Sequence, residues 1–253
     1  MTTVRDWLFS IPTLIVFGSI LGLGELIGRF TLLFGMGPYE QMMARLQRSL
    51  IWAFGLSGVS VDVEGQQHLA MSGGYIFVSN HQSMFDIPIF GGILSSYIPR
   101  FVAKKSLAKG IPTVSLYLRE GGHALIDRGN RQQALTAIAD MGVWCEDRGV
   151  AAVIFPEGTR SRDGSLGSWK VAGLEALLAA APDLPIVPTV IDGSWKVFAS
   201  NMMPVPFGTD VRVRVGEPID RRTDEDPEAI LALCRQFAQD TLDEWHTGSK
   251  PSG

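Results

Sequence analysis

A histidine and an aspartate five positions apart are the first side chains in this sequence that could do acid–base chemistry. His81 and Asp86 belong to residues 80–86, NHQSMFD. Pro88 predicts that a helix begins near Asp86, which leaves His81 in the turn before it. There the carboxylate can bond one imidazole nitrogen and leave the other free to act as a base. The alternative is an aspartate that only caps the helix beside an unrelated histidine.

A second group, residues 155–162 (FPEGTRSR), directly follows a strongly apolar stretch. It contains Glu157, Gly158, Thr159 and Arg160. An arginine in a loop at the end of a strand offers a forked pair of donors to an anion such as phosphate. Taken alone, an ordinary surface turn explains the same residues.

A third group is basic. Between residues 100 and 131 bases outnumber acids, although the whole chain carries a formal net charge of −4. A local positive surface in an acidic protein favours an anionic ligand or a lipid headgroup, with Lys104 and Arg128 as candidates. For Lys105 and Lys109 a solvated helix face is an equal explanation. The net charge argues against nucleic acid as a partner.

The chain offers no metal-ligand cluster and no familiar covalent nucleophile. His68, His123 and His246 lack metal-ligand spacing, and the G-x-S-x-G elbow of serine hydrolases does not occur. Cys145 and Cys234 lie far apart among apolar residues, which favours buried, reduced thiols in a reducing compartment. We therefore expect no metal and no bound cofactor.

The elements that must position these groups alternate between strand and helix. Strands are predicted at residues 59–64, 75–78, 150–155, 186–190 and 211–215, and helices at 39–56, 130–146, 170–181 and 227–245, with another starting near residue 86. Because valine alternates with arginine at 211–215, that strand is predicted at a sheet edge. The pattern predicts an α/β fold, a central mixed β-sheet flanked by helices, with sites where strands end.

The amino-terminal 38 residues are predicted to form an apolar helical membrane segment. Residues 7–24 contain no charged side chain, and Glu25 and Arg29 interrupt before a second apolar stretch at 30–38. A membrane span needs ~20 apolar residues, so the first run is borderline. The stretch also contains two G-x-x-x-G pairs, which suit close helix packing: Gly18 with Gly22, and Gly24 with Gly28.

This divides the chain into a membrane segment at 1–38, an α/β domain at 39–246 and a frayed tail at 247–253. A core helix of a soluble domain is the alternative for the first segment. Whether the segment spans the bilayer, or enters and leaves on one side, stays open.

Four motifs, in this order and at this spacing, resemble those of the 1-acylglycerol-3-phosphate acyltransferase family. They are Asn80-His81 with Asp86, Lys104 ahead of Pro112 and residues 126–128 (IDR), residues 155–160 (FPEGTR), and residues 186–188 (IVP). The resemblance covers roughly residues 75–218. It implies that His81 is the base and Asp86 its partner. It also implies that the acceptor and its phosphate are bound by Lys104, Arg128, Glu157, Gly158, Thr159 and Arg160.

The resemblance implies transfer of a fatty acyl group from acyl-CoA or acyl-ACP to the hydroxyl of 1-acyl-sn-glycerol-3-phosphate, which makes phosphatidic acid. The acyl thioester would be a co-substrate, and the protein would be membrane-associated with its active site on the cytoplasmic side. Family members often carry Glu where Ser106 stands, and Lys-Gly where Lys170-Val171 stands. These differences keep other acceptors open, such as a lyso-ornithine lipid. A thioesterase and a non-catalytic membrane-binding scaffold are the remaining alternatives.

Overall fold

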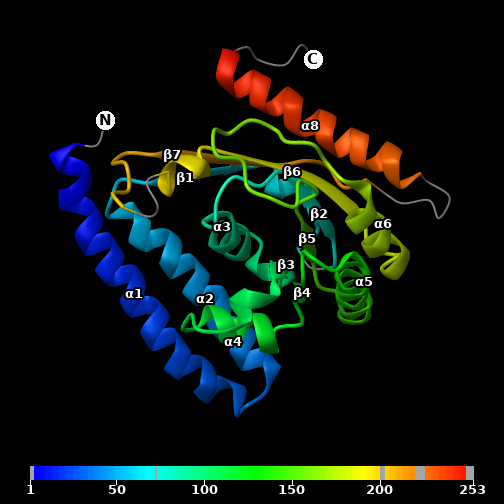
Figure 1. Cartoon of the computed structure of the whole chain (residues 1–253), viewed down its shortest axis with the longest axis horizontal. Coiled ribbons are helices and arrows are strands. Elements are labelled where there is room, and N and C mark those ends of the chain that lie inside the picture. The colour runs from blue at the N-terminus through cyan, green and yellow to red at the C-terminus, as the bar shows by residue number, and fades with distance from the viewer. Residues whose placement is uncertain (1–2, 72, 200–202, 220–225, 249–253) are drawn as a thin grey trace.

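Strand β2 (Ile76–Ser79) shows why the sheet must be covered on both faces. Ile76 and Val78 pack into one hydrophobic cluster and Phe77 into another, and all three side chains are fully buried. Successive side chains of a strand point to opposite faces. A sheet that is apolar on both sides is stable only between two layers of helices, and the computed structural model has this arrangement (Figure 1).

The structure describes residues 3–71, 73–199, 203–219 and 226–248, so most of the predicted tail lies outside the described residues. Within these ranges the sheet has seven strands, in the order β1-β7-β6-β2-β5-β3-β4. Besides β2, the strands are β1 (Ser60–Glu64), β3 (Arg100–Lys104), β4 (Ala124–Ile126), β5 (Ala152–Ile154), β6 (Ile186–Asp192) and β7 (Asp210–Val215). The α-helices are α1 (Val4–Leu32), α2 (Met36–Gly55), α3 (Asp86–Ile93), α4 (Val114–Glu120), α5 (Arg131–Arg148), α6 (Val171–Ala180), α7 (Ser194–Val197) and α8 (Pro227–Thr247).

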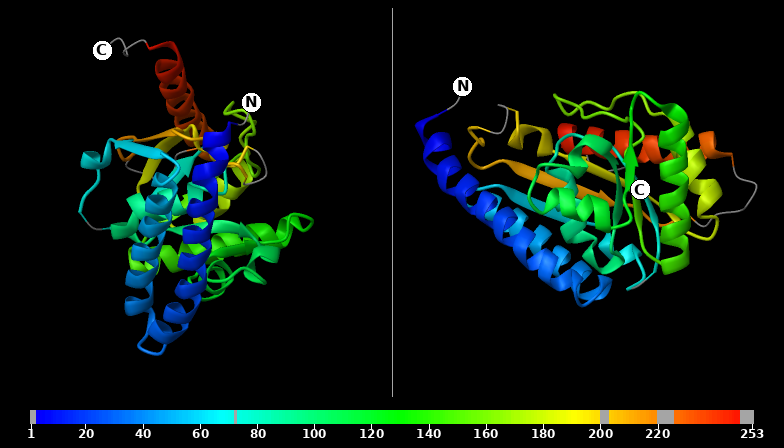
Figure 2. Two further views of the ribbon diagram at one scale, coloured as in Figure 1. Left: turned by 90° about the vertical axis from the view of Figure 1, so that its left-hand side faces the viewer. Right: turned by 60° about the horizontal axis from the view of Figure 1, so that its bottom comes forward.

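The two helical layers differ in make-up. Helices α5, α6 and α8 cover one face of the sheet and α2, α3 and α4 cover the other, with α1 packed along the outer side of α2 (Figures 1 and 2). Short 3₁₀ turns at Gln66–His68, Ser95–Tyr97 and Lys105–Ala108 connect neighbouring elements. Strands β2 to β6 run parallel to one another, whereas β7 is antiparallel to β6. The predicted mixed sheet flanked by helices is therefore confirmed.

The predicted edge position of residues 211–215 is wrong. Strand β7 lies inside the sheet, paired with β1 on one side and with β6 on the other. Val211, Val213 and Val215 are buried against α2 and α3, while Arg212 stays exposed because α8 leaves that part of the other face open. Alternation of apolar and polar side chains reports which face of a strand is covered, and carries no information about its edges. The edge strand next to β7 is β1, and β4 is the edge strand on the opposite side of the sheet.

Strands β3 and β4 and helix α4 all fall within residues 100–131, which the sequence marks only as basic. The two strands have five and three residues, too few for a clear period. Basic residues stand at or just after the ends of the two strands. The short apolar stretches between them are therefore not recognisable as strands in the sequence.

Helix α1 runs without a break through the two charged residues that separate the predicted apolar stretches. Glu25 and Arg29 lie one turn apart and form an ion pair of 2.6 Å, so both charges are accommodated without a break. Glu25 also accepts a 2.7 Å hydrogen bond from the backbone N–H of Thr113, and the Thr113 hydroxyl donates to Leu21 O at 2.6 Å. The middle of α1 is thus fastened to the loop that precedes α4.

Only one of the two predicted G-x-x-x-G pairs packs against the rest of the described protein. A Cβ at Gly24 would lie 2.2 Å from Leu46 and 2.7 Å from Thr113, and one at Gly28 would lie 3.2 Å from Tyr39. At Gly18 and Gly22, by contrast, no described atom lies within 4 Å of such a Cβ. Helices α1 and α2 approach closely at the second pair, while the first pair faces outward.

The predicted boundary between residues 38 and 39 stays a prediction. Helix α2 already begins at Met36, so this point lies in its first turn. The two helices form an antiparallel hairpin along one side of the domain (Figure 2).

Candidate active site

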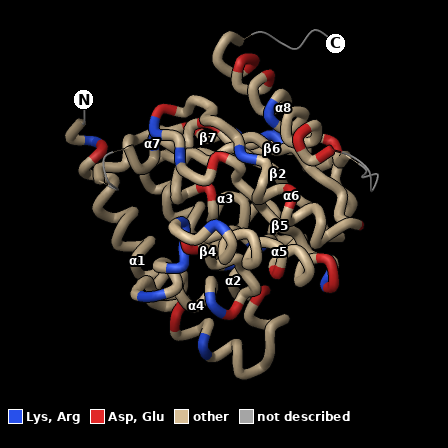
Figure 3. The backbone as a smooth tube through the Cα atoms, turned by 45° about the vertical axis from the view of Figure 1, so that its right-hand side comes forward, with Lys and Arg blue, Asp and Glu red and all other residues tan. Residues whose placement is uncertain are grey.

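The predicted motifs come together because five parallel strands have their carboxyl ends on the same side of the sheet. Residues 80–86 follow β2, residues 155–160 follow β5, and Lys104 and Arg128 stand at the ends of β3 and β4. This is where sites form in open α/β sheets. Figure 3 shows several Lys and Arg positions on the chain around β4 and α4, beside these strand ends.

His81 and Asp86 form the acid–base pair that their spacing predicts. His81 Nδ1 lies 2.7 Å from Asp86 Oδ2. Because a carboxylate only accepts, Nδ1 carries the proton and Nε2 keeps its lone pair for use as a base. Asp86 is the first residue of α3, and His81 lies in the turn before that helix. The alternative of a merely capping aspartate does not describe this geometry.

The imidazole ring of His81 packs against Phe155 on one face and is partly open to solvent. Its ring stacks on that of Phe155, with 4.3 Å between centroids and 17° between planes. The side chain of His81 is 16% exposed, whereas that of Asp86 is fully buried. Nε2 has no hydrogen-bond partner among the described residues. The free nitrogen is therefore accessible to an acceptor hydroxyl while the carboxylate stays dry.

The buried carboxylate of Asp86 uses both its oxygens. Besides His81, Oδ2 accepts hydrogen bonds from the backbone N–H groups of Gln82 at 2.7 Å and Ser83 at 2.9 Å. Oδ1 accepts from the hydroxyl of Ser194 at 2.5 Å. A buried charge destabilises the fold unless hydrogen-bond donors surround it. Hydrogen bonds to a charged group are also stronger than those between neutral groups.

Glu157 joins the β2 and β5 loops. Its Oε1 accepts from the backbone N–H of His81 at 3.1 Å, and its Oε2 accepts from that of Gly167 at 3.4 Å. The carboxyl is buried, and burial raises the pKa of Glu157 above its ordinary value, although the hydrogen bonds from His81 and Gly167 act in the other direction. Its predicted contact with the acceptor stays a prediction.

The remaining residues of the FPEGTR motif lie exposed beside His81. Gly158, Thr159 and Arg160 all reach solvent, and Gly158 adopts a φ of +64°, which glycine tolerates best. The backbone N–H of Ser161 donates to the carbonyl of His81 at 2.7 Å. Arg160 therefore sits one residue from a direct contact with the base.

Lys104 and Arg128 lie further along the same row of strand carboxyl ends. Lys104 is opposite Ile126 in the β3–β4 register, and Arg128 follows two residues later in the turn after β4. Both side chains are exposed, and strand β5 separates their strands from β2. At roughly 4.8 Å per strand, β3 lies about 10 Å from β2. In the described part of the chain, no hydrogen bond or ion pair joins either residue to His81.

The sequence reasoning missed the turn that follows β6. Ser194 reaches Asp86, and Gln82 Nε2 donates to Asp192 Oδ1 at 3.2 Å. The other oxygen of Asp192 lies 2.8 Å from His246 Nε2, in the last turn of α8. The missed signal was available, because Asp192 and Ser194 flank the carboxyl end of a buried strand, as the recognised motifs do.

Neither cysteine contributes a nucleophile. Cys145 and Cys234 are free and buried, and burial raises the pKa of each thiol to about 12. Thiols are nucleophilic only as thiolates, so both are unreactive at neutral pH. Among the described residues no group of three His, Cys, Asp or Glu side chains could hold a metal ion.

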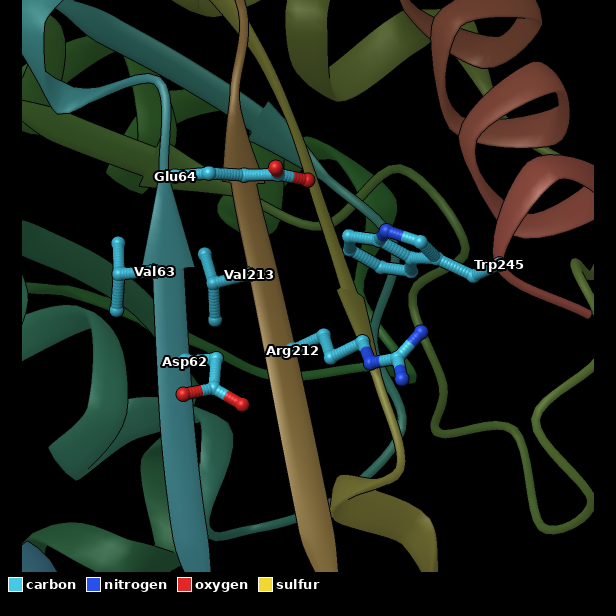
Figure 4. A pocket seen from close by; sticks show the side chains of 6 residues that line it. All are labelled: Asp62, Val63, Glu64, Arg212, Val213 and Trp245. Atoms are coloured by element: carbon cyan, nitrogen blue, oxygen red, sulfur yellow. The ribbon is translucent and has the colours of Figure 1, made fainter. Parts of the chain in front are cut away.

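A cavity of about 310 Å³ lies away from these residues. It opens beside the β1–β7 edge of the sheet, under the carboxyl end of α8 (Figure 4). Its lining consists of Asp62, Val63, Glu64, Arg212, Val213 and Trp245. None of the predicted catalytic or phosphate-binding residues borders it.

Comparison with known proteins identifies relatives along most of the chain. A family model described as acyltransferase matches residues 60–192. The 1-acyl-sn-glycerol-3-phosphate acyltransferase alpha of Mus musculus is 26% identical over 227 residues, covering 86% of this chain and 78% of its own. The human protein of the same name is 27% identical over 218 residues, covering 86% and 76%. The 1-acyl-sn-glycerol-3-phosphate acyltransferase of Limnanthes douglasii is 30% identical over 161 residues, covering 62% and 54%.

One solved structure is similar over nearly the whole chain. It is the crystal structure of the 1-acyl-sn-glycerophosphate (LPA) acyltransferase, PlsC, from Thermotoga maritima. The TM-score is 0.72 at 22% sequence identity, covering 96% of this chain and 98% of that one. This likeness shows that the two chains share a fold.

The raised pKa of Glu157 predicts how stability changes with pH. The folded state holds the Glu157 proton more tightly than the unfolded chain, so this residue costs stability once pH rises above the ordinary glutamate value. A neutral amide does not carry that cost. Between pH 4 and pH 6, the melting temperature of Glu157→Gln should therefore rise relative to that of the wild type.

The control is Glu175→Gln, which changes an exposed glutamate on α6. Its melting temperature should follow that of the wild type across the same range. A Glu157→Gln difference that stays constant, or falls as pH rises, would show that burial does not dominate at this carboxyl.

Proposed function

This chain belongs to the acyltransferase family, as its motifs predict, and we propose that it acylates the free hydroxyl of 1-acyl-sn-glycerol-3-phosphate to make phosphatidic acid. The observation that carries the proposal is the His81–Asp86 pair, with Nε2 open to an incoming hydroxyl. The relatives that cover most of the chain bear the name of this reaction, which supports this acceptor over other lysolipids. The FPEGTR loop beside the base supplies the group for its phosphate.

The reaction we propose is direct transfer. His81 Nε2 removes the proton of the acceptor hydroxyl as its oxygen attacks the thioester carbonyl. Asp86 stabilises the resulting imidazolium through Nδ1. When the tetrahedral intermediate collapses, the C–S bond breaks, and the imidazolium returns the proton to the departing thiolate. The products are the diacyl lipid and the free thiol.

Direct transfer fits the absence of a usable protein nucleophile among the recognised motifs. A covalent acyl-enzyme would need an activated serine or cysteine next to the base. The two cysteines are buried, and the raised pKa of each thiol keeps it protonated. Both substrates must then be bound together, so we propose sequential kinetics with thiol release that depends on the acceptor.

We propose an acyl thioester, acyl-CoA or acyl-ACP, as the donor and no further cofactor. The exposed basic residues at the ends of β3 and β4, Lys104 and Arg128, are suited to phosphate groups. Their strands lie about two strand spacings from β2, whereas Arg160 precedes Ser161, whose N–H bonds the carbonyl of His81. We assign Arg160 to the acceptor phosphate first, with Lys104 and Arg128 further along the same row of strand ends.

We also propose that α1 attaches the protein to a membrane. The helix is long and apolar enough to cross one, and only 17% of its most apolar window is buried in the protein. Its outward face exposes large apolar side chains, among them Leu8, Ile15 and Leu26. Because α1 packs on α2 and is hydrogen-bonded to Thr113, we favour a helix that lies in one leaflet. Reduced, buried cysteines support an active site on the cytoplasmic side.

The first test is product formation. We expect the purified protein, given 1-acyl-sn-glycerol-3-phosphate and an acyl thioester, to form phosphatidic acid detectable by mass spectrometry. His81→Ala should lower turnover by at least about 10²-fold, because a positioned general base contributes on that order. A mixed panel of lysolipids, acyl-CoA and acyl-ACP resolves the acceptor and the carrier.

Each competing function gives a different result in that assay. Product from a lyso-ornithine lipid but not from the glycerophosphate would replace the acceptor. Thiol release without any lysolipid would identify a thioesterase. A folded protein that binds lipid vesicles but turns over no panel member would be a scaffold. Near-normal turnover in His81→Ala would contradict the mechanism.

The second test separates acceptor binding from donor binding. Arg160→Ala should raise the KM for the lysophospholipid about ten- to hundredfold, since a charge-assisted contact contributes roughly 1.5–3 kcal/mol. The KM for the acyl thioester should change little. Arg162→Ala is the matched control, because Arg162 is exposed in the same loop. Equal damage to both KM values, or equal damage in both variants, would remove Arg160 from the phosphate site.

The third test concerns the outward face of α1. Replacing Leu8, Ile15 and Leu26 by Gln should reduce partitioning onto phosphatidylcholine vesicles at high salt by at least about a hundredfold, since each buried leucine-sized side chain contributes roughly 1.5–3 kcal/mol. The control is Leu233→Gln, an equally exposed leucine on α8. If the triple variant still pellets with vesicles like the wild type, the attachment lies outside this face.

A further inference from the structure

The carboxylate of Asp86 is held from two directions, and one of them comes from a distant part of the chain. Its Oδ2 is held locally, by backbone groups of the turn that also contains His81. Its Oδ1 accepts a hydrogen bond from Ser194, which is 108 residues away in sequence. This is the only hydrogen bond to Oδ1 from any described residue.

Ser194 is placed there by the turn after β6. Gly193 has a φ of +84°, and a Cβ at this position would lie 2.1 Å from Asp210 O, so a side chain is excluded. The sharp turn directs the next residue, Ser194, at the first residue of α3. Both Ser194 and Asp86 are 0% exposed. Bulk solvent therefore does not reach this contact in the folded protein.

The same turn is tied to the histidine loop in a second way. Asn80 Nδ2 donates to Ile191 O at 2.8 Å, and Ile191 N–H donates to Asn80 Oδ1 at 2.9 Å. Gln82 Nε2 donates to Asp192 Oδ1, whose other oxygen contacts His246. The residues on both sides of His81 are thus locked to the end of β6, and through it to α8.

We propose that Ser194 is a positioning residue for acyl transfer: its hydroxyl orients the Asp86 carboxylate, which in turn orients His81. This rests on the proposed function only for the kinetic part of its test. Without Ser194, Oδ1 would be an unpaired oxygen of a buried carboxylate, and a shift of the carboxylate that finds it another donor would pull Oδ2 away from His81 Nδ1. Held at both oxygens, the carboxylate keeps the imidazole in the Nδ1–H form that leaves Nε2 free.

The kinetic experiment uses the full-length protein with three single variants. Ser194→Ala should lower kcat about ten- to hundredfold, the scale of a small misplacement of a catalytic group, with each KM within about twofold of the wild type. Ser194→Cys keeps the size and a weak donor, so its kcat should lie between the two. Ser57→Ala is the control, because Ser57 is equally buried and hydrogen-bonded to Thr13, away from the site. Its kcat should match the wild type.

A second measurement needs no turnover. In protein carrying ¹⁵N-labelled histidine, the ring signals of His81 at high pH report which nitrogen bears the proton. The wild type should show the Nδ1–H form, and Ser194→Ala a mixture of both forms. If the wild type acylates no lysolipid but Ser194→Ala still shows the expected mixture of forms, the proposed function fails and the positioning role stands.

The proposal is overturned if folded Ser194→Ala keeps a kcat within twofold of the wild type. It is equally overturned if the His81 ring signals of Ser194→Ala and the wild type are the same. If Ser194→Ala does not fold, Ser194→Cys decides: an unchanged kcat and an unchanged ring signal would reject the role. A loss of kcat in Ser57→Ala as large as that in Ser194→Ala would show a general packing effect instead.

Discussion

A fully buried carboxylate has to be satisfied on every side, and the arrangement of this active site follows from that requirement. Asp86 receives two backbone N–H groups from its own turn, the imidazole of His81 and the hydroxyl of Ser194. Removing a charge from water without such donors would cost several kcal/mol. The β2 and β6 loops meet because the two strands are neighbours in the sheet, and together they supply these donors. Because His81 Nδ1 is one of the donors that Asp86 needs, the same set of hydrogen bonds orients the imidazole.

The second loop pair is organised in a related way around Glu157. Its carboxylate links the main chain of His81 to that of Gly167, and the carbonyl of His81 accepts from Ser161. The FPEGTR loop is therefore attached to His81 through both the N–H and the C=O group of that residue. The exposed Arg160 lies in this loop between the two attached residues, Glu157 and Ser161. The same few backbone groups thus hold the two sequence motifs together.

What the sequence predicted well is what short-range spacing controls. His81 and Asp86 are five residues apart at a helix start, so their contact follows from local geometry. The link from Asp86 to Ser194 spans 108 residues and depends on β6 lying next to β2, which no local pattern encodes. The edge assignment of β7 failed because alternation describes faces only. In residues 100–131 charged side chains at the strand ends masked two short strands.

The contacts of α1 have a consequence for exchanging parts between relatives. Gly24 lies against Leu46 and Thr113, Thr113 is bonded to Glu25, and near the start of the helix Ser10 accepts from Val205 N–H at 2.8 Å. These contacts reach into three separate regions of the chain. A chimera that grafts another anchor onto residue 39 would inherit none of the matching surfaces. The same constraint applies in evolution. We therefore expect α1 and the contacting residues of the domain to change together and not to behave as interchangeable modules.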